Sequence, residues 1–221
     1  MILLKISVLG CGYVGAVTGA CFAELGHDIF FVDVDLGKVK AISSGISPIF
    51  EPGLDELLTK NRTQISAATD THQAIQETEI TFVCVGTPSN SDGSIDLTYI
   101  QSACQDIGNV LRQKDGKHIV VIKSTVLPGT TEGVVRQILE EVSGKKAHVD
   151  FGLASNPEFL REGSALSDFF SPDRIIISVA DNYAQQAFDE LYSSFDCPKL
   201  CTTIPVAEMI KYVSNAFLAT K

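Results

Sequence analysis

The chain contains 221 residues, of which 45% are hydrophobic and 20% are charged, and its formal net charge is −10 at pH 7. This length and composition predict a soluble globular protein of one large domain or one and a half domains. The negative charge, without a local cluster of Lys or Arg, argues against nucleic acid as a partner. No apolar run approaches the roughly 20 residues that span a bilayer, so we expect no membrane partner. Residues 1–4 lead directly into an apolar segment, which does not resemble a signal peptide.

The cysteines show no C-x-x-C spacing, and four of the six lie within apolar segments. This usage predicts reduced, buried cysteines in a cytoplasmic protein. Cys197 precedes Pro198 and Lys199 just before a short predicted strand, outside any glycine-rich setting, so we expect a structural role for it. No metal site is predicted, because the four histidines stand far apart in the sequence (His27, His72, His118 and His148).

The first apolar run, at about residues 2–9, is followed by Gly10-Cys11-Gly12-Tyr13-Val14-Gly15. This pattern predicts a buried strand, a tight turn and the start of a helix. The first glycine permits the turn, the second lets a pyrophosphate approach the backbone, and the third lets the helix pack closely on the strand. The helix N-terminus then favours the phosphate charge. Glycine turns also join strands to helices for purely structural reasons. The next strand therefore decides between a dinucleotide site and a purely structural turn.

The second apolar run, at about 28–34, contains Phe30-Phe31-Val32 and then Asp33, eighteen residues after Gly15. An acid at the end of this strand can accept a hydrogen bond from a ribose 2′-hydroxyl, which favours NAD over NADP. Asp35 is the weaker candidate for this role, because it is predicted to cap the next helix. The glycine turn and Asp33 together predict an NAD site.

Apolar runs of strand length recur at about 80–85, 118–123, 148–154 and 174–179, and a shorter run lies near Gln64-Ile65-Ser66. Most of the intervals between them show helical periodicity. This alternation predicts an α/β fold, a Rossmann-like doubly wound parallel sheet with helices on both faces. The short run is expected to add an edge strand. Residues 205–221 have apolar residues at helical spacing and no stop signal, so we expect a helix that is cut short.

Two threonines follow the predicted strands at 80–85 and 118–123. Thr87 lies in Val85-Gly86-Thr87-Pro88, and Thr125 lies in Ser124-Thr125-Val126. In an open parallel sheet, ligands bind beyond the carboxyl ends of the strands, so both hydroxyls are expected to face the same crevice as the glycine turn. The alternative, that each hydroxyl only closes a turn beside a proline, stays open.

Two further segments carry candidate catalytic side chains. Asn156 and Pro157 predict a helix start, with Asn156 as N-cap, which would place Glu158 and Glu162 on one helix face. These carboxylates either complement the helix dipole or lie over a substrate, where desolvation would raise their pKa. Near the C-terminus, Lys211 and Asn215 are one helical turn apart. They are either solvated, as most helix lysines are, or desolvated to stabilise an oxyanion or hold a water.

Several segments together resemble the nucleotide-sugar 6-dehydrogenases, and the resemblance covers essentially the whole chain. They are Gly10-Cys11-Gly12-Tyr13-Val14-Gly15, Ser47-Pro48-Ile49-Phe50-Glu51-Pro52-Gly53-Leu54, Val85-Gly86-Thr87-Pro88, Ser124-Thr125-Val126, Asn156-Pro157-Glu158-Phe159-Leu160-Arg161-Glu162 and Glu208-Met209-Ile210-Lys211-Tyr212. The resemblance implies NAD-dependent oxidation of the C6 hydroxyl of UDP-glucose, GDP-mannose or a relative to a carboxylate, in two hydride transfers.

The resemblance also implies the roles of individual residues. It places NAD against Gly10, Gly12, Tyr13, Val14, Gly15, Asp33, Lys38, Thr87, Thr125 and Glu162. It places the sugar nucleotide against Glu158, Phe159, Leu160, Arg161, Lys211 and Asn215. Thr125 would lie near the reacting carbon and Glu162 beside the nicotinamide. Glu158 would order water for thioester hydrolysis, while Lys211 and Asn215 would stabilise oxyanion intermediates.

By the same resemblance, residues 1–203 form the NAD-binding Rossmann domain and residues 204–221 begin a central dimerisation helix. The family's UDP-binding C-terminal domain, with its nucleophilic cysteine and partner aspartate, is absent from this sequence. We therefore expect the chain to bind NAD without completing the oxidation, and the complete enzyme to be a homodimer. One alternative is a non-catalytic NAD-binding module. Another is a short-chain or 3-hydroxyacid-type dehydrogenase, which Asn156-Pro157-Glu158 argues against.

The identity of the nucleotide sugar is predicted from four further segments. Pro172-Asp173-Arg174-Ile175 and residues 215–221 are more similar to UDP-glucose dehydrogenases. Residues 124–129 and Ser143-Gly144-Lys145-Lys146 are more similar to GDP-mannose dehydrogenases. UDP-glucose is the expected substrate and GDP-mannose the alternative.

Overall fold

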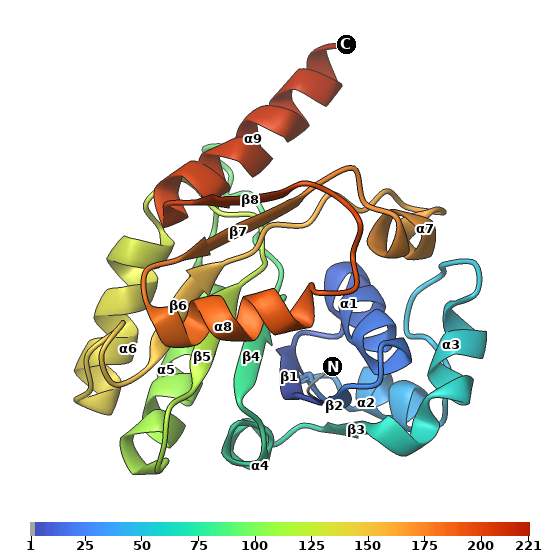
Figure 1. Cartoon of the computed structure of the whole chain (residues 1–221), viewed down its shortest axis with the longest axis horizontal. Coiled ribbons are helices and arrows are strands. Elements are labelled where there is room, and N and C mark those ends of the chain that lie inside the picture. The colour runs from blue at the N-terminus through green and yellow to red at the C-terminus, as the bar shows by residue number, and fades with distance from the viewer. Residues whose placement is uncertain (1–2) are drawn as a thin grey trace.

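A computed structural model describes residues 3–221 (Figure 1), which form one eight-stranded sheet in the order β3-β2-β1-β4-β5-β6-β7-β8. The strands are β1 (Lys5–Leu9), β2 (Asp28–Val32), β3 (Ile65–Ala68), β4 (Ile80–Val83), β5 (Ile119–Ile122), β6 (Gly152–Ser155), β7 (Ile175–Val179) and β8 (Lys199–Thr202). The helices are α1 (Tyr13–Glu24), α2 (Leu36–Ser43), α3 (Leu54–Lys60), α4 (Thr71–Glu77), α5 (Thr98–Gln113), α6 (Arg136–Ser143), α7 (Ala165–Phe170), α8 (Asn182–Leu191) and α9 (Ile204–Thr220), with a 3₁₀ turn η1 (Arg62–Gln64) and a π-helical turn η2 (Thr131–Val135).

The predicted α/β fold is confirmed, including the edge strand β3 near Ile65. The predicted first strand began at residue 2, which lies outside the described residues. β6 begins at Gly152, later than the predicted 148–154, because His148 starts a turn and has a left-handed backbone with φ of 64°. Asp35 caps α2 as predicted, since its carboxylate accepts the Gly37 N–H at 2.7 Å.

The predicted parallel sheet has one exception, because β7 runs antiparallel to β6. A parallel neighbour requires the chain to cross back to the edge where the previous strand began. The connection after β6 instead stays at the edge where that strand ends, where Asn156 and Glu158 are tied down by hydrogen bonds. The chain therefore enters β7 from that edge and runs in the opposite direction.

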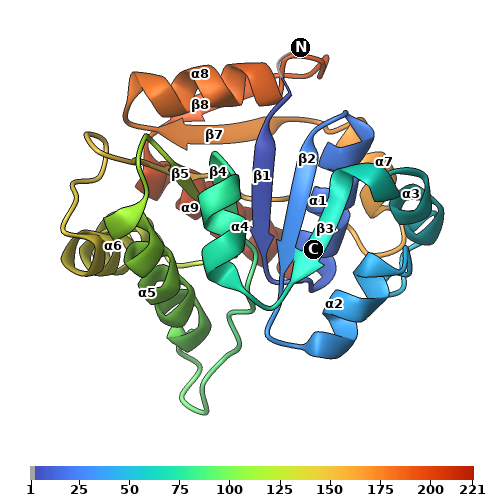
Figure 2. The same ribbon diagram turned by 90° about the horizontal axis from the view of Figure 1, so that it is seen from below.

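The sheet separates two hydrophobic cores, because successive side chains of a strand point to opposite faces. In β2, Ile29 and Phe31 pack with residues of α1, α3, α7 and α8, while Phe30 and Val32 pack with residues of α4, α5 and α6. Figure 2 shows the first strands between these helix layers. The predicted helices on both faces are thus confirmed, and both faces exclude water from the strands.

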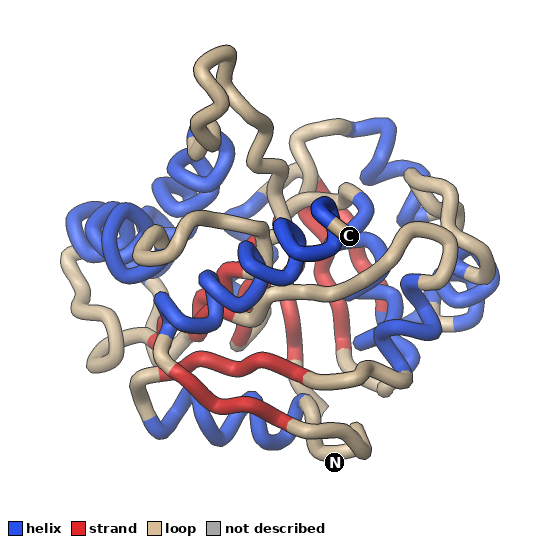
Figure 3. Tube along the Cα trace, turned by 90° about the horizontal axis from the view of Figure 1, so that it is seen from above, coloured by secondary structure: helices blue, strands red, loops and turns tan. Residues whose placement is uncertain are grey.

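The last helix, α9, starts against the sheet and then extends away from it (Figure 1). Its first half contacts β6, β7 and η2, and seen from above it crosses the region over the strand ends (Figure 3). Ile204, Ala207, Glu208 and Lys211 are buried there. The second half is largely exposed, including Phe217 and Leu218. The predicted C-terminal helix is confirmed, and its buried half brings Glu208 and Lys211 to the sheet.

Candidate active site

The glycine turn between β1 and α1 is closely packed at Gly10 and Gly15 and open at Gly12. Gly10 has a φ of 98°, and a Cβ atom there would lie 2.7 Å from the carbonyl oxygen of Cys84. A Cβ on Gly15 would lie 1.8 Å from the Gly10 carbonyl oxygen, whereas a Cβ on Gly12 would meet no atom within 4 Å. The first and third glycines are therefore required for packing, and the space above Gly12 is free for a ligand to approach.

The N-terminus of α1 faces this open space. Gly12 is its N-cap and supplies no side-chain hydrogen bond, and α1 has no acidic residue in its first turn. Tyr13 and Val14 are its first residues, so their backbone N–H groups belong to the unsatisfied donors of the helix end. Such donors, together with the helix dipole, bind phosphate groups. The turn thus fits the pyrophosphate of a dinucleotide.

Asp33 directly follows β2 and lies against the same turn. Its Oδ2 accepts the Cys11 N–H at 2.7 Å, and its Oδ1 accepts the Asp35 N–H at 2.9 Å. The Lys38 ammonium lies 3.5 Å from Oδ2. These contacts fix the carboxylate, which is 8% exposed, beside the turn. An acid held in this position can accept hydrogen bonds from a ribose.

The sheet order reverses between β1 and β4, so the crevice for a ligand lies at the ends of these two strands. Thr87, after β4, donates from its hydroxyl to the carbonyl oxygen of Thr125, after β5, at 2.9 Å. The two predicted threonines are therefore neighbours at the carboxyl edge of the sheet. This bond also fits the alternative of a turn-closing hydroxyl, so the geometry accommodates both interpretations of Thr87.

A cavity of about 540 Å³ lies between the segment after β6 and the middle of α9. Of the predicted substrate residues, Glu158, Phe159, Leu160, Arg161, Lys211 and Asn215 line it. The Lys211 ammonium donates to Glu158 Oε1 at 2.8 Å, and the side chains are only 8% and 11% exposed. Of the two alternatives for Lys211, the desolvated one fits the structure, since Lys211 is buried and paired with a carboxylate.

The helix predicted to start at Asn156 and Pro157 does not form. Residues 156–164 are a loop with one turn, and the next helix is α7. Asn156 cannot cap a helix because its side chain is used elsewhere, donating to the Ile176 carbonyl and accepting from Lys123. Glu158 and Glu162 consequently do not share a helix face. Glu158 accepts the Leu160 N–H at 2.6 Å through its second oxygen.

The remaining predicted site residues lie outside the cavity or at its edge. Glu162 is exposed and does not line the cavity, and neither does Thr125. The Arg161 side chain is 75% exposed and forms an ion pair with Asp168. The Tyr13 hydroxyl reaches the Arg161 carbonyl at 3.2 Å, which connects the start of α1 to the loop that lines the cavity.

The sequence predicts no individual role for Glu51, although its segment, residues 47–54, is one of those that carry the family resemblance. Glu51 is 6% exposed and accepts hydrogen bonds from the Tyr13 hydroxyl and from the N–H groups of Gly163 and Ala165. Burial opposes its ionisation, but these hydrogen bonds outweigh burial and hold the pKa of Glu51 below its usual value. Burial and the bond to Glu51 raise the pKa of Tyr13.

Glu208 likewise has no predicted role of its own, and it belongs to residues 208–212, another segment that carries the resemblance. It is 2% exposed and accepts the N–H groups of Gly129 and Thr131 at 2.6 and 2.9 Å. Burial raises its pKa, and these hydrogen bonds only partly offset that. An acid three residues after Pro205, between the apolar residues Ala207 and Met209, is the signal available in the sequence. Through Glu208, α9 holds the loop that follows Thr125.

Within residues 3–221, no three His, Cys, Asp or Glu side chains are grouped as a metal site would require. The helices of that same range include none with the length and apolar character to cross a membrane. Of the cysteines predicted to be buried, four are buried, namely Cys11, Cys21, Cys84 and Cys104, whereas Cys197 is half-buried and Cys201 is exposed. Burial raises the pKa of each of these thiols.

The chain is similar to nucleotide-sugar dehydrogenases. It is 47% identical over 220 residues to GDP-mannose 6-dehydrogenase of Pseudomonas syringae pv. tomato, a match that covers 99% of this chain and 50% of that protein. It is 44% identical over 223 residues to UDP-glucose 6-dehydrogenase AglM of Haloferax volcanii, covering 99% of this chain and 52% of that protein. The chain thus spans about half the length of these curated relatives.

A solved structure gives the same result. A ternary complex of GDP-mannose dehydrogenase from Pseudomonas aeruginosa superposes with a TM-score of 0.97 at 44% identity, covering 98% of this chain and 50% of that one. Residues 4–196 match the model of the UDP-glucose/GDP-mannose dehydrogenase family, NAD binding domain. The predicted family resemblance is confirmed. Because that match includes most of the chain, this protein belongs to the UDP-glucose/GDP-mannose dehydrogenase family, and residues 4–196 are its NAD-binding domain.

Proposed function

We propose that this chain holds NAD at the glycine turn and, within a complete nucleotide-sugar 6-dehydrogenase, takes part in oxidising the C6 hydroxyl of the sugar. The observation that carries the proposal is the buried Glu158–Lys211 pair in a cavity whose loop is tied to the start of α1. The glycine turn and Asp33 fit the pyrophosphate and ribose of the cofactor. NAD, when bound, supplies the acceptor for hydride.

The chain's own residues would bind and orient the substrate. Lys211 offers a positive charge, and Asn215 an amide on the next turn of α9, to an oxygen that becomes negative during oxidation. Glu158, held by Lys211 and by the Leu160 N–H, would orient water or accept a proton. Thr125 and Glu162 would act from outside the cavity, toward the cofactor. The backbone at Phe159 and Leu160 and the side chain of Arg161 would border the sugar nucleotide.

The identity of the sugar nucleotide is the finer part of the proposal. The relatives include both a GDP-mannose and a UDP-glucose dehydrogenase, at 47% and 44% identity. Two sequence segments are more similar to UDP-glucose dehydrogenases and two to GDP-mannose dehydrogenases, while the identities and the superposition support GDP-mannose. We therefore propose a UDP- or GDP-linked hexose, to be distinguished by direct binding.

The domain boundaries and the assembly belong to the same proposal. Residues 1–203 would form the cofactor domain and 204–221 the start of a central helix. The exposed apolar side chains of α9, such as Val213, Phe217 and Leu218, would be covered in a homodimer of the complete enzyme. The proposal also places the protein in the cytoplasm, with neither nucleic acid nor a membrane as its partner.

Calorimetric titration tests the cofactor site first. Wild type should bind NAD, and Asp33→Ala should bind at least about tenfold more weakly, because the ribose loses a charged acceptor. Asp35→Ala is the matched control, since Asp35 caps α2 and should leave NAD affinity nearly unchanged. Equal loss in both variants, or none in either, would contradict the role of Asp33.

The substrate arm uses the NAD-saturated chain, titrated with UDP-glucose and with GDP-mannose. Binding of one sugar nucleotide that is lost in Lys211→Met supports the proposal and identifies the nucleotide. NAD binding without either sugar nucleotide favours a non-catalytic NAD-binding module. No NAD binding would overturn the proposed function of the chain by itself.

A further inference from the structure

Lys123 is a buried cation that forms no ion pair within the described part of the chain. Its residue is 5% exposed, and no carboxylate within residues 3–221 forms an ion pair with it. Its ammonium donates to Asn156, to the side-chain Oδ1 at 3.0 Å and to the backbone carbonyl at 3.3 Å. It also lies 5.8 Å from the centre of the Phe82 ring, a cation–π contact. Burial lowers the pKa of Lys123.

An unpaired buried charge costs stability. Packing alone therefore does not explain an ammonium at this position of the sheet. Lys123 lines the same cavity as Glu158 and Lys211, and both act on it electrostatically. Its position points to a role in the site.

Asn156, the partner of Lys123, is fixed from three neighbouring elements. Its backbone N–H donates to Ile122 at the end of β5, and its Nδ2 donates to Ile176 in β7 at 2.8 Å. Its Oδ1 accepts from Lys123 and from the Tyr192 hydroxyl at 2.6 Å. Asn156 is 1% exposed, so it is an anchor, and the loop that lines the cavity begins at this residue.

Only Pro157, whose ring restricts φ, separates Asn156 from Glu158. The orientation of Asn156 is therefore transmitted over a short, stiff piece of chain to the carboxylate that meets Lys211. Lys123 itself directly precedes Ser124 and Thr125 on the cofactor side. We propose that Lys123 is a positioning residue of the site: by holding Asn156, it fixes the loop that brings Glu158 to Lys211.

This inference rests on the proposed function for its meaning, but its geometry can be tested without substrate or cofactor. The Leu160 N–H donates to Glu158 at 2.6 Å, so its hydrogen exchange, measured by NMR on the full chain, reports whether Glu158 is in place. In Lys123→Met the Leu160 amide should exchange about fivefold faster or more, the equivalent of one lost hydrogen bond. Amides of the central sheet, such as those of Val8 and Phe31, should keep their wild-type rates.

Two variants make the result specific. Tyr192→Phe removes the other donor to the same Asn156 oxygen. It should accelerate Leu160 exchange less than Lys123→Met does, because Lys123 also donates to the Asn156 backbone carbonyl. Lys123→Arg retains a donating cation and should restore wild-type exchange. Unchanged Leu160 exchange in Lys123→Met, equal acceleration in Tyr192→Phe, or acceleration throughout the sheet would each overturn the proposal. If methionine is not accommodated, Lys123→Leu takes its place, and failure of both to fold would assign Lys123 to folding instead. A failed NAD titration would not affect this test.

Discussion

Glu158 and Lys211 are 53 residues apart in the chain, yet their side chains meet at 2.8 Å in a buried ion pair. Glu158 comes from the loop after β6, and Lys211 from the half of α9 that packs on the sheet. The pair therefore joins two elements that the sequence does not connect locally. It also leaves Asn215, one turn further along α9, at the edge of the same cavity.

Breaking this pair from one side should destabilise the fold. Lys211→Met leaves the Glu158 carboxylate buried without its counter-ion, which costs about 3 kcal/mol in the free energy of unfolding. Glu158→Gln should cost a similar amount, since it leaves the ammonium uncompensated. Urea unfolding of the two single variants and the double variant measures the coupling. Losses that simply add in the double variant would show that the two charges do not interact.

Two glycines of the same turn should respond oppositely to alanine. Gly15→Ala places a Cβ 1.8 Å from the Gly10 carbonyl oxygen, and should unfold the chain or cost more than about 3 kcal/mol. Gly12→Ala meets no atom within 4 Å and should change stability by no more than about 0.5 kcal/mol. Because the added methyl would occupy the space proposed for the pyrophosphate, Gly12→Ala should still abolish NAD binding by calorimetry. A Gly12→Ala chain with wild-type NAD affinity would contradict the proposed site.

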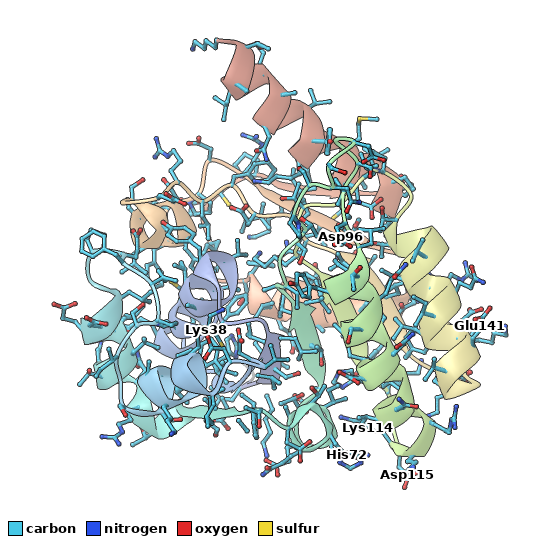
Figure 4. All side chains as sticks on the ribbon, turned by 180° about the vertical axis from the view of Figure 1, so that it is seen from behind. Lys38, His72, Asp96, Lys114, Asp115 and Glu141 are labelled. Carbon is cyan, nitrogen blue, oxygen red and sulfur yellow. The ribbon has the colours of Figure 1, made fainter. Side chains whose placement is uncertain are left out.

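His118 should make the fold sensitive to acid. It is fully buried and contacts Thr81 at 2.7 Å. Its Nδ1 lies 3.2 Å from the ammonium of Lys114, which Figure 4 shows at the end of the molecule away from α9. Burial, and then the Lys114 charge, lower its pKa from 6.5 to about 3. The unfolded chain therefore binds a proton below pH 6.5 that the folded chain rejects until about pH 3. Stability is fully present above pH 6.5 and falls as the pH decreases toward 3.

The loss of stability in acid follows from the difference between the pKa of His118 in the unfolded chain and its pKa in the folded chain. At pH 5 His118 should cost about 2 kcal/mol relative to pH 8. Urea unfolding at both pH values, compared between wild type and His118→Gln, isolates this contribution from that of the carboxylates. The variant should be less stable at pH 8 but lose less stability on acidification. An identical pH dependence in both proteins would show that His118 is not a source of acid sensitivity.

Glu51 should be needed for the order of the cavity loop. Glu51→Gln keeps the shape of the side chain but removes the charge that accepts from Tyr13, Gly163 and Ala165. The expected loss in the free energy of unfolding is about 2 kcal/mol, with faster hydrogen exchange at Gly163 and Ala165. Glu56→Gln, at an exposed position of α3, is the control and should change neither quantity. Wild-type exchange at both amides in Glu51→Gln would contradict this role.

The glycine turn and Asp33 could be predicted from the sequence because their requirements are local. The turn needs glycines at fixed spacing, and the acid must directly follow the next strand. The failure at Asn156 has an equally clear cause. Its sequence has the features of a helix N-cap, but Lys123, Ile176 and Tyr192 compete for its side chain, and none of these lies near it in the sequence. Glu51 and Glu208 received no role for the same reason, since their partners are 38 or more residues away.

By itself, the sequence determined the α/β alternation, the glycine turn with Asp33, the C-terminal helix and the family resemblance, since each depends on residues close together in the chain. The tertiary structure decided the antiparallel entry of β7, the loop in place of a helix after Asn156, and the meeting of Glu158 with Lys211. These features depend on buried polar groups finding partners across the sheet. Local propensity cannot predict such partners, because the cost of leaving a buried polar group unpaired exceeds the gain from one capped helix.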